Sequence, residues 1–233
     1  SFSLAEECLS KAFTISPHNA RIGRALSEAF HNQNKFADEL TISSTLVNQD
    51  PNDPKNIQYK AFALISNDRM EESISFLENF RKKYPHEFAT RFWSRGGKEP
   101  NSLSHNLAFF YQYFAKKKIN EKKLKFNKIE FNENNKPSIV SEITSEIKQL
   151  FEKSLHEYDL ILHEVKDNDK VAKFGHDVLN QIELIYAEFQ KCQVLILLQK
   201  YPESLDLIQK ILKKNPTDIE YLFAHGRIQF YLH

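Results

Sequence analysis

The chain has 233 residues, of which 41% are hydrophobic and only five are glycine. This composition provides enough apolar material for a substantial core with few breaks, and it predicts a folded, helical protein. The formal net charge of +1 creates no overall field that would favour DNA or an anionic membrane. No signal peptide is visible, and no apolar run is long enough for a membrane span.

The two cysteines, Cys8 and Cys192, lie far apart in the sequence. We interpret both as small packing residues with reduced thiols, which favours a cytoplasmic protein. The chain begins inside the second helix of a pair and ends inside a first helix, so we expect it to be part of a longer protein. The sequence predicts no particular oligomeric state.

The first third of the chain is built from repeats of equal length. Pro17, Pro51 and Pro85 are evenly spaced, and each follows an amphipathic helix. Their spacing, about 34 residues, is typical of an array of helical pairs. Asp53 is placed to cap one of these helices, with Pro54 as its first residue. Apolar residues at helical spacing predict helices over 2–15, 20–32, 36–48, 57–66 and 70–83.

The periodicity fails after the third of these prolines. We expect a short helix over 87–94, stopped by Gly96 and Gly97, and then a new helix over 102–118. The next segment, 116–137, is rich in lysine and asparagine, and it fits a short hairpin and a mobile loop equally well.

The helix over 102–118 carries more aromatic residues than one core-facing stripe needs, because they cover more than half of its circumference. Some must therefore face a second surface. We expect that surface to be the long helices that follow or, as the alternative, a separate subunit. The aromatic residues are Phe109, Phe110, Tyr111, Tyr113 and Phe114.

An apolar stripe predicts one long helix over 138–165. The polar residues 167–169 break this helix and cap a second long helix from residue 171. The interval from Pro85 to Pro216 is close to four repeat periods. The middle of the chain is therefore either a set of divergent repeats or an inserted helical hairpin, and we favour the hairpin.

The repeat returns near the end of the chain, where an amphipathic helix over 201–211 precedes Pro216. With this fourth copy the sequence resembles the tetratricopeptide repeat family, whose unit is about 34 residues of helix, turn and helix ending in a proline. The resemblance covers about residues 1–87 and 182–233. Small residues stand where that family packs two helices closely: Ala5, Ser27, Ala61, Ser73, Cys192, Ser204 and Gly226.

Two residues depart from the family's pattern. Glu39 stands at a small-residue position, and Lys60 stands at a position that is usually leucine. The resemblance still implies an all-α fold, a right-handed superhelix of helix-turn-helix repeats with a divergent or inserted long helical hairpin in the middle. We divide the chain into N-terminal repeats (1–87), a divergent segment (88–181) and C-terminal repeats (182–233).

The family binds peptides in a concave groove lined by the first helix of each pair. The resemblance therefore implies a protein-interaction scaffold that holds a peptide or protein segment by charge-assisted hydrogen bonds and apolar contacts. Its groove residues would be Arg21, Arg24, Glu28, His31, Asn32, Lys55, Gln58, Phe62, Ser66, Tyr186, Phe189, Gln193, Glu220, Phe223 and Arg227.

Two other functions fit the same pattern. The repeats could be the substrate-recruiting or regulatory arm of an enzyme, such as a glycosyl- or methyltransferase, whose catalytic domain lies outside this chain. Alternatively, the protein could be a structural subunit of an assembly, with its groove already filled. We predict no catalytic residue and no cofactor for this chain, because it contains no P-loop, no G-x-G-x-x-G and no G-x-S-x-G.

One variant of the family clamps a C-terminal carboxylate with lysine, asparagine and arginine. Arg24 and Asn32 are available here, but Glu28 lies one helical turn from each. A carboxylate at this position would repel the ligand and occupy the arginine, so the sequence argues against such a clamp.

His156, Asp159 and His163 share one side of the long helix at a spacing that permits metal ligation. A solvated polar stripe explains them more simply, so we predict no metal site. The lysine run from Lys116 to Lys128 has a similarly simple explanation, because lysine runs in loops usually serve solvation. Nucleic acid is not the expected partner, since the chain lacks the basic excess of such binders.

Overall fold

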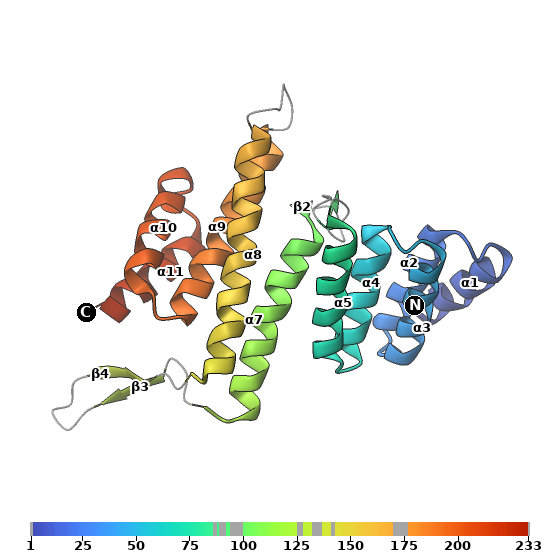
Figure 1. Ribbon diagram of the computed structural model, residues 1–233, viewed down its shortest axis with the longest axis horizontal. Helices are drawn as coiled ribbons and strands as arrows, with labels where there is room; N and C mark the ends of the chain where they lie inside the picture. The colour runs from blue at the N-terminus through green and yellow to red at the C-terminus, as the bar shows by residue number, and fades with distance from the viewer. Residues whose placement is uncertain are drawn as a thin grey trace. The chain divides into compact units, whose positions relative to one another are not determined.

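A computed structural model describes residues 2–85, 88, 92–93, 100–124, 128–131, 137–140, 143–169 and 177–232 (Figure 1). The contacts divide the chain into two compact units. Unit 1 comprises residues 1–93 and 101–106, and unit 2 comprises residues 94–100 and 107–233.

Unit 1 is a row of helices in which each packs against the next. The helices begin and end within three residues of the predicted bounds. Asn19 caps the second helix by accepting hydrogen bonds from two backbone N–H groups, and Asp53 caps the fourth, with Pro54 as its first residue. The helices are α1 (Phe2–Ile15), α2 (Ala20–His31), α3 (Phe36–Gln49), α4 (Pro54–Ser66) and α5 (Met70–Lys83).

The core of unit 1 lies between first and second helices of the pairs. Ala61 is completely buried, and its small side chain lets α4 and α5 approach each other. The Ser73 hydroxyl of α5 donates a hydrogen bond of 2.7 Å to the Ala61 carbonyl, so this buried polar group has a partner.

The two departures from the repeat pattern each have a local explanation. Glu39 is buried, and its carboxylate lies 3.1 Å from Nδ1 of His31 on α2. Lys60 is half-buried and places its ammonium over the ring of Phe76 at 5.0 Å. Both charged side chains are therefore accommodated, Glu39 at a position usually taken by a small residue and Lys60 at one usually taken by leucine.

Unit 2 contains the remaining helices and a β-hairpin. Strand β3 (Lys128–Phe131) pairs antiparallel with β4 (Pro137–Val140), with Lys128 opposite Val140 and Phe131 opposite Pro137. A hairpin is therefore present, but its second strand starts only at Pro137 and lies almost wholly beyond the segment 116–137 in which we expected it. The helices are α7 (Leu103–Glu121), whose first four residues belong to unit 1, α8 (Ser145–Asp169), α9 (Asp177–Leu197), α10 (Tyr201–Lys214) and α11 (Ile219–Leu232).

Three predicted elements differ from the structure. Residues 167–169 do not break the long helix, because α8 continues through Asp169, and the start expected for the next helix at residue 171 lies outside the described residues. The long helix begins at Ser145 rather than at residue 138, because residues 138–140 pair with β3 instead. Of the short helix expected over 87–94, Phe92 and Trp93 form strand β1, which pairs with β2 (Pro100–Asn101). The other residues of that prediction, apart from Phe88, lie outside the described residues, and so do Gly96 and Gly97.

The end of α7 has the same geometry as the ends of the regular first helices. At the ends of α2, α4, α7 and α9 a backbone N–H bonds to the carbonyl five residues earlier, and the preceding residue has a positive φ. This is the Schellman arrangement. The positive-φ residues are Asn34, Asp68, Lys123 and Gln199, with φ between 51° and 61°.

A buried serine bond also repeats in three helical pairs. Ser154 of α8 donates to the Ala108 carbonyl of α7 at 2.8 Å, as Ser73 does to Ala61. Ser204 of α10 donates to the Cys192 carbonyl of α9 at 3.3 Å. Together with the helix ends, these bonds favour a divergent repeat, α7 with α8, over the inserted hairpin. The extra residues, including β3 and β4, lie in the turn between α7 and α8.

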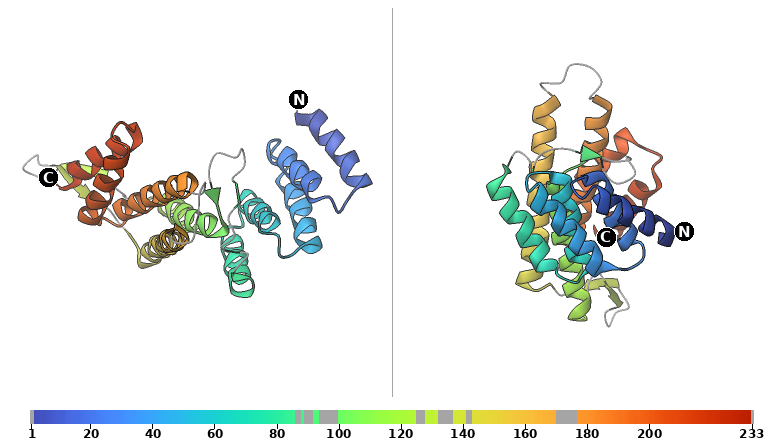
Figure 2. Two further views of the ribbon diagram at one scale, coloured as in Figure 1. Left: turned by 90° about the horizontal axis from the view of Figure 1, so that it is seen from above. Right: turned by 90° about the vertical axis from the view of Figure 1, so that its right-hand side faces the viewer.

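Within unit 2, α9 lies between α7 and α11 (Figure 2). One face of α9 joins a core with α7 and α8 through Ala187 and Val194. The opposite face joins a core with α10 and α11 through Phe189 and Cys192. We call α2, α4, α7, α9 and α11 the first helices, and α1, α3, α5, α8 and α10 the second helices.

The cysteines differ from each other. Cys192 is a buried packing residue, and burial raises the pKa of its thiol. Cys8 is exposed, so it does not have the packing role that we expected. Among the helices that the structure describes, none is both long and apolar enough to cross a lipid bilayer.

Candidate peptide-binding surface

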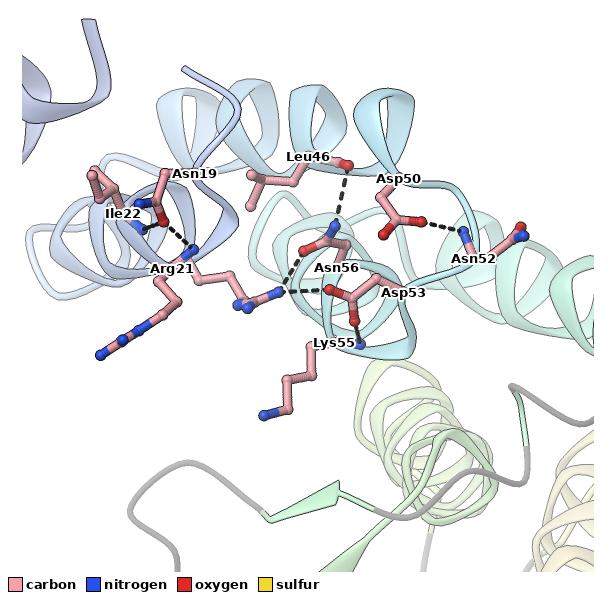
Figure 3. Close-up of polar contacts among 10 residues, drawn as sticks. Asn19, Arg21, Ile22, Leu46, Asp50, Asn52, Asp53, Lys55 and Asn56 are labelled. Atoms are coloured by element: carbon pink, nitrogen blue, oxygen red, sulfur yellow. Dashed lines mark hydrogen bonds and ion pairs between the residues drawn. The ribbon is translucent and has the colours of Figure 1, made fainter. Parts of the chain in front are cut away.

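Arg24 of α2 is held in a polar network with the start of α4 (Figure 3). Its Nη1 donates to Oδ2 of Asp53 and to Oδ1 of Asn56, each at 2.8 Å. Asn56 is buried, and its side-chain N–H group donates to the Leu46 carbonyl of α3 at 3.2 Å. The Arg24 guanidinium therefore joins α2 to the start of α4, and Asn56 extends the network to α3.

Asp53 serves this network and the helix cap at once. Its Oδ2 accepts from Arg24, while its Oδ1 accepts from the backbone N–H of Lys55 at 2.8 Å. The charge of Arg24 is thus neutralised by a carboxylate that also stabilises the N-terminus of α4. Arg24 pairs with Asp53 and not with Glu28, which corrects the pairing on which our argument against a carboxylate clamp was based.

Two more predicted groove residues contact other helices of unit 1. Glu28 accepts a hydrogen bond from the Tyr59 hydroxyl of α4. Gln58 donates to the Asn106 side chain at 3.4 Å. With Arg24, these residues connect neighbouring first helices.

The other predicted residues of unit 1 are more accessible. Arg21 and Lys55 are exposed, and their side chains point away from the network in Figure 3. Asn32 is exposed at the C-terminal cap of α2, and Phe62 is 37% exposed on α4. Part of the first-helix face of unit 1 is therefore available to a ligand.

Two of the three predicted residues on α11, Phe223 and Arg227, form one cluster, and the third, Glu220, is exposed. Phe223 is 67% exposed, and the Arg227 guanidinium lies over its ring at 5.9 Å. Arg227 also lies over the Tyr231 ring at 5.7 Å and donates to the Tyr231 hydroxyl at 3.2 Å. Its side chain is thus fixed by two rings on its own helix.

The predicted residues on α9 divide between core and surface. Phe189 is buried against Tyr221 of α11, with ring centroids 4.7 Å apart. Tyr186 is half-buried and close enough to Tyr158 of α8 to raise the pKa of that hydroxyl, although burial is the larger cause. Gln193 is half-exposed.

The accessible aromatic residues of α7 were not among the predicted groove residues. Phe110, Tyr111 and Phe114 are buried, whereas Phe109 and Tyr113 are each 46% exposed, with stacked rings 6.1 Å apart. The aromatic residues of α7 therefore divide between the core and an exposed surface. Tyr111 lies under Lys153 of α8, on one of the long helices we expected to cover it, while Phe109 and Tyr113 line an exposed face.

Lys116 continues this exposed face, because it lies seven residues after Phe109 and three after Tyr113. The pKa of Lys116 is lowered, first because nearby atoms displace water from the ammonium group and second because Arg227 is close. This electrostatic effect indicates that Lys116 and Arg227 are near each other within unit 2.

Three lysines of the described part of this run have carboxylate partners. Lys118 and Lys122 both bind Glu146, at 2.7 Å and 3.2 Å, and Lys117 is 3.7 Å from Glu121. The hydrogen bonds from Lys118 and Lys122 lower the pKa of Glu146. Part of this charge therefore stabilises local structure, whereas neither Lys116 nor Lys123 has a carboxylate partner among the described residues.

The histidine-containing stripe on α8 is exposed at all three positions, His156, Asp159 and His163. Asp159 forms an ion pair with Lys191 of α9. In the part of the chain that the structure describes, no group of three potential ligands is arranged to hold a metal ion.

These pairs, caps and small-residue contacts define a helical-repeat protein of the tetratricopeptide type. Known structures share this fold: a tetratricopeptide repeat protein from Parabacteroides merdae has a TM-score of 0.57 at 12% identity, over 99% of this chain and 67% of that chain. A chain of the Naa15/Naa10 complex bound to HypK-THB has a TM-score of 0.50 at 14% identity, over 98% of this chain and 26% of that chain.

The likeness is one of fold, since the identities are low. No family model matches the sequence, and no curated protein matches it. The chain spans 67% of the first structure's chain and about a quarter of the second.

Proposed function

We propose that this protein is an interaction scaffold that binds a peptide segment of another protein on the exposed faces of its first helices. The observation that carries the proposal is the pair of exposed, stacked rings on α7, Phe109 and Tyr113. Large aromatic side chains are costly to leave in water and are enriched in the centres of protein interfaces.

The fold supports the same function. Stacked helical pairs present a series of parallel first helices, which suits recognition of an extended or helical segment. One structure with this fold is, by its name, a complex of several proteins. Within unit 1, considered by itself, the accessible residues Arg21, Asn32, Lys55 and Phe62 are candidate contacts for a peptide.

Site-specific photo-crosslinking tests the proposal. A photoreactive phenylalanine analogue would replace Tyr113 on first helix α7 in one variant and the exposed Gln209 on second helix α10 in a matched control. We expect the Tyr113 variant to crosslink to a discrete protein in native extract, and the Gln209 variant not to.

The crosslinking yield at position 113 should also depend on the neighbouring ring of Phe109. Phe109→Ala in the crosslinking variant should reduce the yield severalfold while leaving the helical circular dichroism unchanged, because Phe109 is an exposed residue. Equal crosslinking from Tyr113 and Gln209, or a yield insensitive to Phe109, would contradict binding on this face.

A further inference from the structure

Helix α11 exposes an apolar stripe on the side where the other first helices pack against a second helix. Leu222 is 47% exposed, whereas Ile57 at the same repeat position of α4 is 1% exposed. Phe230 is also exposed, whereas Ile196 at its repeat position on α9 is buried. A helix at the edge of a helical array needs a polar outer face to stay soluble, so this apolar stripe indicates a binding surface.

Gly226 lies between these two side chains, and the charged residues of α11 lie beside the stripe. The repeat places Gly226 at the position of Ala61, which is completely buried where α4 meets α5. Glu220 and Arg227 lie about 100–120° around the helix from Gly226. An apolar partner can therefore cover the stripe without burying either charge.

Helix α1 exposes the complementary surface. It occupies the place of a second helix in the row, and it packs against α2. Ala5 is exposed, whereas Ser73 of α5 and Ser204 of α10 are completely buried at the same repeat position. Leu4 and Cys8, on the adjoining side of the helix, are exposed as well. This side of α1 is therefore uncovered in the part of the chain that the structure describes.

We propose that the 233-residue chain associates head to tail, with α1 of one copy packed as the second helix on α11 of another copy. Ala5 then lies on Gly226, as Ser73 lies on Ala61 within the chain. The helix order supports this contact, because α11 is a first helix and α1 is a second helix, so the alternation continues across it. The inference goes beyond the proposed function, because it uses no residue of α7.

The pattern of α1 favours a second copy over an unrelated helix. Helices α5 and α10 each cover their first helix with a small residue followed, four and seven positions later, by apolar residues. Helix α1 has the same pattern in Ala5, Leu9 and Ala12. One contact therefore buries the uncovered apolar surfaces of both helices.

Analytical ultracentrifugation of the 233-residue chain over a range of concentrations tests the association. We expect dimers and larger species to accumulate as the concentration rises. Leu222→Asp should weaken association at least about tenfold, because it places a carboxylate in the apolar contact. The matched control is Leu160→Asp, at an exposed apolar residue of α8, which should associate as the unmodified chain does.

Mixing two blocked variants distinguishes a head-to-tail contact from a symmetric one. Ala5→Trp blocks α1 and leaves α11 intact, while Leu222→Asp does the reverse, so neither variant alone should associate. Their mixture should form a one-to-one dimer and nothing larger, because only one productive contact is left. Both substituted residues are exposed within one chain, so the helical circular dichroism should stay unchanged.

A thiol crosslink tests the register of the two helices. Lys60 of α4 lies over the Phe76 ring of α5, and the repeat places His225 and Cys8 at these two positions. A short bismaleimide should therefore join His225→Cys to the exposed Cys8 of another copy. Adding Cys8→Ser to the same variant should abolish the covalent dimer.

Four results would overturn the inference. A chain that stays monomeric at every concentration would reject it and leave the proposed function intact, since crosslinking from Tyr113 to another protein does not involve α1 or α11. A covalent dimer that persists without Cys8 would indicate contact between two α11 helices. A crosslink confined to one chain would show that α1 and α11 meet within a single copy. A photoreactive residue at position 222 that captures only a different protein would assign the stripe to that partner.

Discussion

Arg24 and Arg21 are only three residues apart, yet their surroundings give them different roles. The Arg24 side chain is 16% exposed and is bound to Asp53 and Asn56. Arg21 is exposed at the surface of the same helix. A charged residue on the predicted groove face therefore contributes to stability in one case and is available for binding in the other.

Arg24→Ala should lower the free energy of unfolding by about 1–3 kcal/mol, because it leaves the side-chain oxygen of buried Asn56 without its donor. Urea denaturation measures the change. Arg21→Ala is the matched control and should stay within about 0.5 kcal/mol of the unmodified protein. Equal effects of the two substitutions would show that the network does not contribute to stability.

The two glycines within first helices, one in the first turn of α2 and one in the middle of α11, differ in what surrounds them. A Cβ on Gly23 of α2 would lie 2.5 Å from Cδ2 of Leu46 and 3.0 Å from the Phe13 ring. A Cβ on Gly226 of α11 would meet nothing within 4 Å. Close helix packing thus requires glycine at Gly23 and does not require it at Gly226.

Gly226→Ala should stabilise the protein by about 0.5–1 kcal/mol, since alanine loses less conformational entropy in a helix. Gly23→Ala gains the same propensity but must displace Leu46, so we expect a net loss of about 1 kcal/mol or more. Thermal unfolding of both variants measures the difference. If both substitutions stabilised the protein, α2 and α3 would be able to move apart at little cost in free energy.

The helices of the regular repeats could be predicted from sequence because three independent signals agree there. The repeat period and the apolar stripes place these helices, and the Asp53 cap moves the start of α4 from residue 57 to Pro54, where the structure has it. The β-hairpin and the start of α8 could not be predicted, because residues 138–140 satisfy a helical apolar stripe and a strand equally well. Pairing with β3, a tertiary contact, decides between them.

The candidate site was predictable only in part. Phe223 and Arg227 follow from the repeat alignment and lie on an accessible face. Arg24 and Phe189 were also predicted on first-helix faces, but both are engaged with residues of neighbouring helices, Asp53 and Tyr221. Tyr113 and Lys116 were missed because α7 belongs to a repeat whose enlarged turn breaks the regular period. The spacing of Phe109, Tyr113 and Lys116 was the available signal.

On the scale of the whole molecule, each helix gains its stability from its immediate neighbours. In such arrays the total stability is close to a sum of repeat and interface contributions. Damage to one pair should therefore remain largely local. The division into two compact units leads to the same expectation.

Ala61→Phe tests this expectation, because it inserts a large ring where α4 and α5 are in contact and should cost more than about 1 kcal/mol. Hydrogen exchange followed by mass spectrometry should show the greatest loss of protection in α3, α4 and α5 and a much smaller loss in α9, α10 and α11. Ala37→Phe, at an exposed position of α3, is the control. A uniform loss across the chain would demonstrate a single cooperative unit.

The turn between α7 and α8 has a practical consequence. Hydrogen bonds within the helical pair hold both helices in place, since the backbone closes the end of α7 at Leu124 and Ser154 anchors α8 to Ala108. The segment that connects α7 to α8 is therefore not needed to fix the distance between the two helices. An epitope tag or a fluorescent reporter introduced between β3 and β4 should leave the array folded, which provides a labelling position within the chain rather than at one of its ends.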